Sequence, residues 1–426
     1  MTAAFLLLVL FLLLLIGVPV AISLGFASIT TMILFGNQSL LSLAQKFFHT
    51  MQVYPLLAVP FFILAGAFMT TGGVAKRMID FANAIVGHYR GGLAMAALLA
   101  SAFFAAVSGS APATVVAVGS VMIVGMINSG YSKSFSAGVI CNAGTLGILI
   151  PPSLVMVVYG AITESSIGKL FIAGIVPGIV MTIAMMATIM VIAKQQNLPR
   201  QPKAEVGEVL KSFKEASWGL MLIIIILGGI YAGLFTPTEA AAVSAVYAFF
   251  IAVFVYKDIG LKQVPTVLVD AAKITVMLMF IIANAFMFAF VLTTLQIPQI
   301  ASEFIVGMGL PVWGFLLVLN ILLLAAGNFM EPTSVVLILT PIVFPIAMEM
   351  GIDPIHLGVL MVVNMQIGLV TPPVGLNLFV TAGVAKMSLE DTIRASLPWL
   401  GVLLIVLMLI TYIPWFSLVL PNSLGL

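Results

Sequence analysis

The chain has 426 residues, of which 62% are hydrophobic and only 7% are charged. Soluble globular domains are roughly a quarter charged, so this composition excludes a water-soluble globular fold. It also excludes intrinsic disorder, which requires low hydrophobicity and high net charge. The net charge of +2 gives no reason to expect a nucleic-acid partner. Long apolar runs favour membrane-spanning α-helices over the short alternating strands of a membrane β-barrel.

Apolar stretches predict the membrane elements in chain order. They are 3–35, 53–70, 91–106, 112–128, 135–162, 170–193, 217–235, 240–256, 274–295, 312–326, 333–348, 357–384 and 396–420. We expect 3–35 to be one retained helix with a kink at Gly17-Val18-Pro19, because a signal peptide would begin with positive charge. Stretches 74–90 and 261–273 are amphipathic, which fits either interfacial helices or solvated connectors.

Two pairs of apolar stretches are each separated by a short polar turn. The pairs are 91–106 with 112–128, and 312–326 with 333–348. Several of these stretches are too short to cross a bilayer as one helix. We therefore expect each pair to be a re-entrant hairpin, with the two tips meeting near the membrane midplane, where protein or water must surround the turns.

The two halves of the chain repeat each other. The matching segments are Gly147–Pro152 with Gly368–Pro373, Pro112–Val116 with Pro332–Val336, Ile172–Pro177 with Ile393–Pro398, and Pro19 with Pro237. Five crossings plus one hairpin per half is an odd number, so the second copy is inverted. The charged stretch 194–216 divides the halves, and its lysines and arginines make it the best candidate for a cytoplasmic loop.

The hairpin tips are candidate solute sites, because inverted repeats bind solutes and ions where helices are interrupted. In the first tip glycine permits unusual backbone angles, serine can cap, and proline suits the first turn of the returning helix. That helix start would attract anions, although an ordinary capped helix start is the alternative. The candidate solute-binding residues are Ser108, Gly109, Ser110, Pro112, Thr114, Asn328, Glu331, Thr333, Asn364 and Asn377.

Broken helices are the second candidate feature. Consecutive prolines at 151–152 and 372–373 remove backbone donors, and the glycines beside them weaken the preceding turns. The freed carbonyls and neighbouring side-chain oxygens suit a hard monovalent cation, whereas the alternative is a kink that serves packing alone. We expect two sodium sites, one from the 108–112 tip with the 144–152 break, the other from the 327–333 tip with the 368–373 break. The candidate sodium ligands are Ser108, Gly109, Asn142, Gly144, Thr145, Gly147, Gly327, Gly368 and Thr371.

The two glutamates beside helix starts differ. Thr236-Pro237-Thr238-Glu239 has the spacing of a capping box, so Glu239 is predicted to be structural. Glu331 lies at a hairpin tip, where an ionisable group is a functional candidate that could also cap its own helix. Hydrolase, zinc-protease and P-loop motifs are absent from the sequence, and a single cysteine allows no internal disulfide. An intramembrane hydrolase is therefore disfavoured, and we expect no catalytic residues.

At these motifs the chain resembles the large membrane subunit of a tripartite ATP-independent periplasmic (TRAP) transporter, over essentially its whole length. The motifs are Ser108–Thr114, Gly144–Pro152, Ile167–Pro177, Phe235–Ala242 and Asn364–Asn377. The resemblance implies a sodium-driven secondary transporter in the bacterial inner membrane. It also implies two partners, a small four-helix membrane subunit and a soluble periplasmic binding protein. The solute implied is a small organic acid, such as a C4-dicarboxylate or sialic acid.

The resemblance further implies an all-α, inverted-repeat elevator fold with a fixed scaffold and a mobile transport domain. Scaffold and arm helices would come from 1–90 and 217–311, and the two transport-domain halves from 91–193 and 312–426, joined by the 194–216 loop. A stand-alone sodium-coupled dicarboxylate or citrate carrier, which needs no binding protein, is the alternative.

Overall fold

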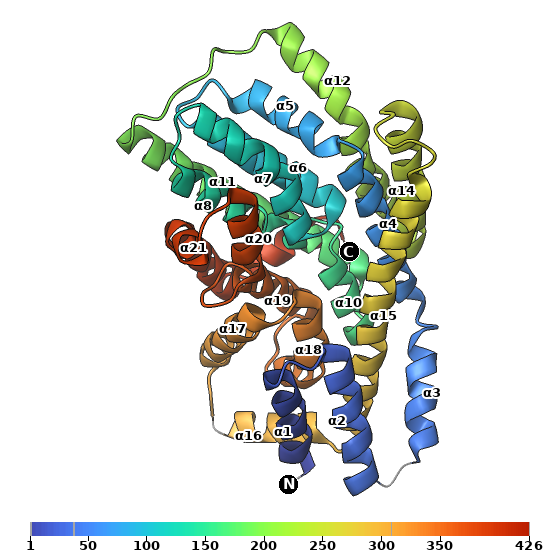
Figure 1. Cartoon of the computed structure of the whole chain (residues 1–426). Helices are drawn as coiled ribbons and strands as arrows, with labels where there is room; N and C mark the ends of the chain where they lie inside the picture. Colours follow the sequence, from blue (N-terminus) through green and yellow to red (C-terminus); the bar gives the residue numbers. More distant parts are fainter. Residues whose placement is uncertain (1, 37–38, 308, 426) are drawn as a thin grey trace.

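In the computed structural model, residues 2–36, 39–307 and 309–425 are described, and every regular element among them is helical (Figure 1). Ten helices in this part of the chain are long and apolar enough to cross a membrane. The prediction of a polytopic α-helical membrane protein is confirmed at this level.

The helices of the first half are α1 (Thr2–Leu15), α2 (Val20–Phe35), α3 (Leu40–Thr50), a 3-10 turn (Tyr54–Leu57), α4 (Ala58–Thr71), α5 (Val74–Val86), α6 (Gly92–Ser108), α7 (Ala111–Asn128), α8 (Lys133–Ala143), α9 (Leu146–Leu149), α10 (Leu154–Thr163) and α11 (Ile167–Gln195). Those of the second half are α12 (Val206–Ile223), continued by a π-helical turn (Ile224–Gly228) into α13 (Gly229–Tyr231), α14 (Pro237–Phe250) with a π-helical end (Ile251–Val255), α15 (Val264–Thr294), α16 (Ile297–Gly307), α17 (Val312–Phe329), α18 (Pro332–Glu349), α19 (Pro354–Gly368), α20 (Leu376–Ala385), α21 (Leu389–Tyr412) and α22 (Trp415–Ser423).

The first apolar stretch is a helical hairpin, so the prediction of one kinked helix over 3–35 was wrong. Helices α1 and α2 pack against each other. The rings of Phe5 and Phe35, near the outer ends of the two helices, have centroids 5.2 Å apart. Proline alone usually kinks a helix, but here Gly17 adopts a left-handed φ of +83° that ends α1, and α2 begins after Pro19.

Two charged stretches are more helical than the sequence suggested. The loop between α11 and α12 covers only 196–205, because Glu205 and Glu208 form a capping box that starts α12 at Val206. Stretch 261–273 is no separate element, since most of it belongs to the first turns of the 31-residue α15. Stretch 74–90 does contain a separate amphipathic helix, α5.

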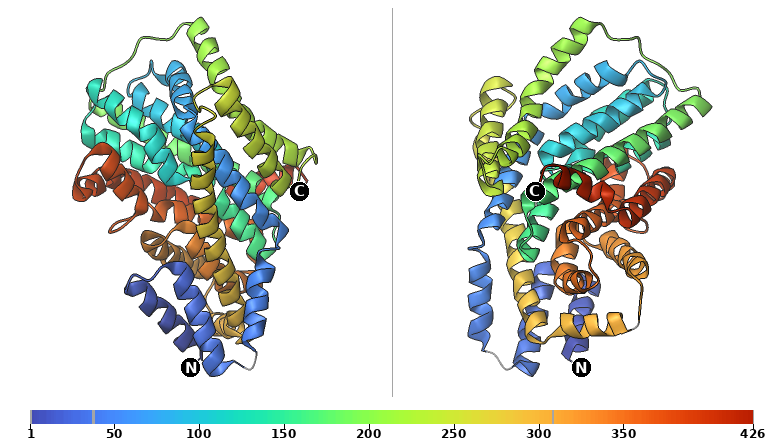
Figure 2. Two further views of the ribbon diagram at one scale, coloured as in Figure 1. Left: turned by 45° about the vertical axis from the view of Figure 1, so that its right-hand side comes forward. Right: turned by 180° about the vertical axis from the view of Figure 1, so that it is seen from behind.

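The repeat is visible in how helices pair across the two halves. Helix α14 packs along α4, and α2 packs along α15, so each pair joins a helix of one half to a helix of the other. Figure 2 shows α15, in yellow, as a long central helix between elements of the first half. The capping box predicted at the start of α14 is confirmed, because Thr236 N donates to Glu239 Oε2 at 2.8 Å and Glu239 N donates to Thr236 Oγ1 at 3.3 Å.

Both predicted hairpins and both predicted helix breaks are present as chain features. Helices α6 and α7 meet at a turn around Gly109, and α17 and α18 meet at Met330-Glu331. The broken helices pack crosswise: α10 lies against α18 of the second hairpin, and α20 lies against α7 of the first. In both breaks the Pro–Pro peptide bond is cis. Whether the hairpins are re-entrant depends on a membrane, and that expectation stays a prediction.

The helix connections gather at two ends of the helical body. At one end Gln201 N donates to Gly87 O at 3.3 Å, and Lys133 Nζ donates to Lys386 O at 2.8 Å. Connections from both halves meet there, and this lysine-rich end carries Arg90, Lys133, Arg200, Lys203 and Lys386.

The opposite end differs in charge. Tyr159, one turn before the end of α10, donates from its Oη to Pro354 O at 2.7 Å, which brings the 164–166 and 350–353 connections to the same end. These two connections contain no Lys or Arg and carry Glu164 and Asp353. The two ends therefore differ in their content of lysine and arginine, the residues that orient membrane proteins.

Candidate functional site

The first hairpin tip, residues 108–114, is held by its own hydroxyl groups; we call it tip 1. Gly109 has a left-handed φ of +61°, which lets the chain reverse between α6 and α7. Ser110 is the N-cap of α7, because Ala113 N donates to Ser110 Oγ at 3.5 Å. Thr114 Oγ1 donates to Ser110 O at 2.8 Å and lies 3.2 Å from Ser108 Oγ. Tip 1 is thus an ordered turn whose hydroxyl groups cluster on one side.

Tip 1 packs directly onto the first helix break, residues 144–152, which we call break 1. A Cβ placed on Gly147 would lie 2.9 Å from Ser110 C, and one on Gly109 would lie 3.1 Å from Pro152 O. The approach at Gly147 requires glycine, because real Cβ atoms essentially never come within 3.0 Å of a neighbouring heavy atom, and Gly109 is favoured by its left-handed φ. The structure therefore brings together the two segments that the sequence assigned to the first sodium site.

The second tip, residues 327–334 (tip 2), is fixed to the second break, residues 368–377 (break 2), by one side chain. Asn328 Nδ2 donates to Pro372 O at 3.0 Å, and Asn328 Oδ1 accepts from the backbone N of Val374 and of Gly375, both at 3.0 Å. A Cβ on Gly368 would lie 2.8 Å from the backbone of Gly327. The same arrangement of tip and break therefore occurs in both halves.

The hydrogen bonds of Glu331 show that it caps its own helix, which is one of the two roles that the sequence left open. Its Oε2 accepts from Ser334 N at 3.2 Å, and its Oε1 accepts from Thr333 Oγ1 at 2.8 Å. Glu331 occupies the position in tip 2 that Ser110 occupies in tip 1, since each precedes its helix by one residue. The Glu331 residue is exposed. Tip 2 therefore presents a carboxylate where tip 1 presents a hydroxyl.

The two halves touch through their broken helices. Gln366 Nε2 of α19 donates to Thr145 Oγ1 at 3.0 Å, and Thr145 Oγ1 donates to Asn142 O at 2.7 Å. Asn377 Nδ2 reaches Cys141 O at 3.4 Å. The Thr145 hydroxyl is thus already engaged on both sides, and a cation would share it with Gln366. The Thr371 hydroxyl likewise donates to Ile367 O at 2.8 Å.

Unpaired amide oxygens gather around the breaks. Among the described residues, Oδ1 of Asn142, Asn364 and Asn377 and Oε1 of Gln366 have no hydrogen-bond donor, although all four residues are fully buried. Buried polar atoms are normally paired. No group of three or more His, Cys, Asp or Glu side chains in the described chain could hold a metal ion. The oxygens on hand are amide, hydroxyl and carbonyl oxygens, which suit a hard cation of low charge.

Asn320 belongs to this network and was missed by the sequence analysis. Its Oδ1 accepts from Asn364 Nδ2 at 2.8 Å, and its Nδ2 donates to Thr411 Oγ1 at 3.0 Å. The available signal was a lone asparagine inside the apolar run 312–326, since a polar side chain in the middle of a membrane helix has to find a partner.

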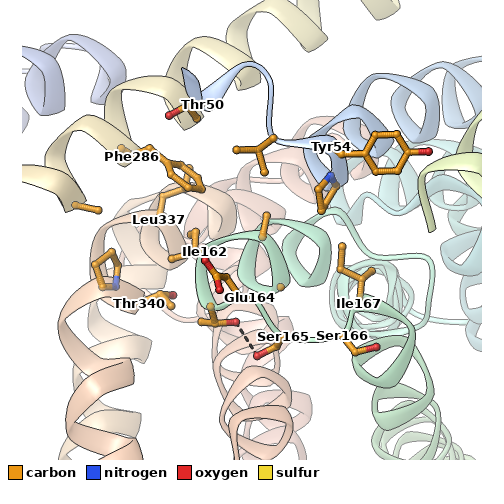
Figure 3. Close-up of a pocket in the computed structure, with 18 of the residues that line it drawn as sticks. Thr50, Tyr54, Ile162, Glu164, Ser165, Ser166, Ile167, Phe286, Leu337 and Thr340 are labelled. Atoms are coloured by element: carbon orange, nitrogen blue, oxygen red, sulfur yellow. Dashed lines mark hydrogen bonds between the residues drawn. The ribbon is translucent and has the colours of Figure 1, made fainter. Parts of the chain in front are cut away.

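A cavity of about 1110 Å³ has no residue of either tip in its lining. Its lining comes mainly from α3, residues 53–55 and 160–168, the start of α14, α15 and α18, and it includes none of the predicted site residues. Figure 3 shows Glu164, Ser165 and Ser166 from the turn and Thr340 from α18 around this space. Lys46 and His49, three residues apart on α3, also line it. Their spacing of three is visible in the sequence, but nothing in the sequence indicates that α3 faces a cavity.

Comparison with known proteins supplies the family context. Residues 7–416 match the family described as the DctM component of the tripartite ATP-independent periplasmic transporter. A Pseudomonas aeruginosa protein, "C4-dicarboxylate TRAP transporter large permease protein DctM", is 62% identical over 404 residues, 95% of this chain and 95% of that protein. "Isethionate TRAP transporter permease protein DctMQ" of Oleidesulfovibrio alaskensis is 42% identical over 406 residues, 94% of this chain and 63% of that protein. The solved YdaH transporter of Alcanivorax borkumensis has a TM-score of 0.60 at 14% identity, covering 88% of this chain and 87% of that one, a likeness of fold alone.

Proposed function

The chain belongs to the DctM component family of TRAP transporters, and we propose that it imports a small organic acid carboxylate by sodium symport. It is a multi-pass membrane transporter rather than an enzyme. The name of the P. aeruginosa relative supports a C4-dicarboxylate as the solute. The observation that carries the proposal is the pair of tip-and-break units with unpaired buried amide oxygens around them.

Sodium has a physical role in this proposal. Neither tip contains Lys or Arg, so a solute carboxylate near the tips depends on helix N-termini, hydroxyl and amide donors, and a bound cation. Each helix N-terminus supplies only about half a unit of positive charge. A negative charge on Glu331 would oppose an anion at tip 2, which makes the cation more important still. Linkage then requires sodium and solute to tighten each other's binding by the same factor.

The sodium proposal is tested by measuring solute affinity in sodium buffer and in choline buffer. We expect strong binding only in sodium, and a sodium affinity that rises when the solute is present. Equal solute affinity in the two buffers would overturn sodium coupling and require a basic side chain at the site.

We assign the lysine-rich end of the molecule to the cytoplasm, because lysines and arginines in short connections favour that side. The chain would lie in the bacterial inner membrane, with the opposite end facing the periplasm. The 1110 Å³ cavity lies at that opposite end, between the α10–α11 turn and α15. We propose that it is the solute entrance, with Lys46 providing positive potential for an anion and His49 a ring N–H donor. Cysteine-accessibility labelling at Glu164 and Arg200, one from each end, would separate the two orientations.

We propose an elevator mechanism for transport. The α2–α15 and α4–α14 pairs would form the scaffold, and the hairpins with the broken helices would form the moving domain. The direct bonds between the halves, such as Gln366 to Thr145, support motion of both tips as one body. We expect a cross-link between the two domains to stop uptake without impairing solute binding. Undiminished uptake by fully cross-linked protein would contradict the mechanism.

Two partners complete the proposal, a small four-helix membrane subunit and a soluble periplasmic binding protein. The DctMQ relative continues beyond the region that this chain matches, and it supports a second membrane component. The alternative is a stand-alone sodium-coupled carrier. Proteoliposome uptake with and without the binding protein separates them, because only the stand-alone carrier transports free solute at the full rate.

A further inference from the structure

A second, smaller pocket of about 610 Å³ lies between α5, α12 and the end of the helix that contains α14, at the lysine-rich end. Its lining residues are Arg77, Lys211, Lys214, Glu215, Trp218, Val255 and Tyr256. The pocket is built on fixed contacts, because Tyr256 Oη donates to Glu215 O at 2.7 Å. It takes no part in the transport site described above.

The cations of this pocket differ in how they are paired. Arg77 is engaged, since its Nη1 donates to Asp258 Oδ2 at 2.6 Å and its guanidinium carbon lies 3.8 Å from the centroid of the Tyr256 ring. Lys211 and Lys214 are exposed and take part in no salt bridge among the described residues. They lie three residues apart on α12, so their ammonium groups share one helix face. Even with Glu215 nearby, the pocket retains unpaired positive charge.

Along α12, toward its C-terminus, the exposed side chains change from charged to apolar. Trp218 follows Lys214 by one helical turn and is 45% exposed. Beyond it, Met221 and Ile224 are also exposed on this apolar helix. Tryptophan and tyrosine with nearby lysines mark the boundary between lipid headgroups and acyl chains. This order of side chains is the one expected where a helix passes from water into the bilayer.

We propose that this pocket binds the headgroup of an anionic phospholipid, with Lys211 and Lys214 contacting the phosphate and Trp218 lying beside the glycerol and upper acyl region. Basic pockets between membrane helices on the cytoplasmic side bind anionic headgroups in this way. The apolar continuation of the face favours a lipid over a free anion, because a free anion gains nothing from Met221 or Ile224. The site would fix α12 and α5 relative to the membrane surface.

Trp218 provides a direct reporter of the bound lipid. The chain has four tryptophans, of which Trp399 is fully buried and Trp313 and Trp415 are exposed. A variant with Trp313→Phe and Trp415→Phe leaves Trp218 as the exposed fluorophore. The full chain is reconstituted in vesicles that contain brominated phosphatidylglycerol or brominated phosphatidylcholine. Quenching then reports which lipid lies against Trp218.

The matched control is a variant with Trp218→Phe and Trp415→Phe, which leaves Trp313, a residue that is 63% exposed and does not line this pocket. One lysine near an anionic surface is worth about fivefold in binding. We expect quenching at Trp218 to favour phosphatidylglycerol by about fivefold or more, and quenching at Trp313 to show no preference. Lys211→Ala with Lys214→Ala should remove the preference and leave the thermal unfolding unchanged.

Three results would overturn the proposal. Equal quenching of Trp218 by the two lipids would mean that the pocket does not distinguish headgroup charge. Absence of quenching by either lipid would mean that a protein partner covers this face. A preference abolished by inorganic phosphate at constant ionic strength would assign the site to a free anion.

Discussion

Asn328 is the side chain that fixes tip 2 to break 2, and its removal tests how far this contact controls sodium binding. Asn328→Ala deletes three hydrogen bonds. Gly375 N keeps a partner, because it also donates to Asn328 O at 3.1 Å. Pro372 O and Val374 N lose the side-chain partner that they have in the structure. At about 1 kcal/mol for each such bond, the contact is weakened by about 2 kcal/mol.

The lost hydrogen bonds set an upper limit on how far sodium affinity can fall. If the whole 2 kcal/mol serves to hold the tip in its binding geometry, sodium binding weakens by about 30-fold. We expect a rise of tenfold or more in the sodium concentration that half-saturates uptake, measured in proteoliposomes at saturating solute. Thermal unfolding of the same variant should fall as well.

Asn284→Ala is the matched control. Asn284 is as buried as Asn328 but lies on α15, away from both tips, and its Nδ2 donates to Phe280 O at 2.8 Å. We expect this variant to lose stability without a change in sodium dependence. If Asn328→Ala unfolds earlier but keeps the wild-type sodium half-saturation, the tip contact is structural only and the argument for a sodium site there fails.

Three further outcomes are expected. Gly368→Ala would place a Cβ 2.8 Å from the backbone of tip 2 and should abolish uptake, whereas Gly383→Ala, with no atom within 4 Å of the new Cβ, should keep it. Tyr159→Phe removes the hydrogen bond to Pro354 O and should cost about 1 kcal/mol of stability in thermal unfolding, with solute affinity intact. Glu331→Gln keeps an oxygen that can cap the helix but removes the charge, so calorimetry should show tighter solute binding; weaker binding would indicate that the carboxylate itself holds the cation.

The sequence determined the features that depend on local chemistry. Apolar composition gave the membrane class, and the positions of glycine, serine and proline gave the two hairpin turns and the two helix breaks. The capping box at Glu239 was predictable because its hydrogen bonds join residues only three apart. The repeat was also visible in the sequence, because each motif that matches between the two halves is short and continuous.

Only the tertiary structure decided how distant segments meet. The sequence could not show that Gly17 reverses the chain instead of kinking it, because a left-handed glycine and a kink are equally compatible with Gly-Val-Pro. The bond from Gln366 to Thr145 joins residues 221 positions apart, and the 1110 Å³ cavity is lined by residues as far apart in the chain as Lys46 and Pro345. Contacts of this kind follow from how whole helices pack, where many small dispersion and burial terms add up, and no local pattern encodes their sum.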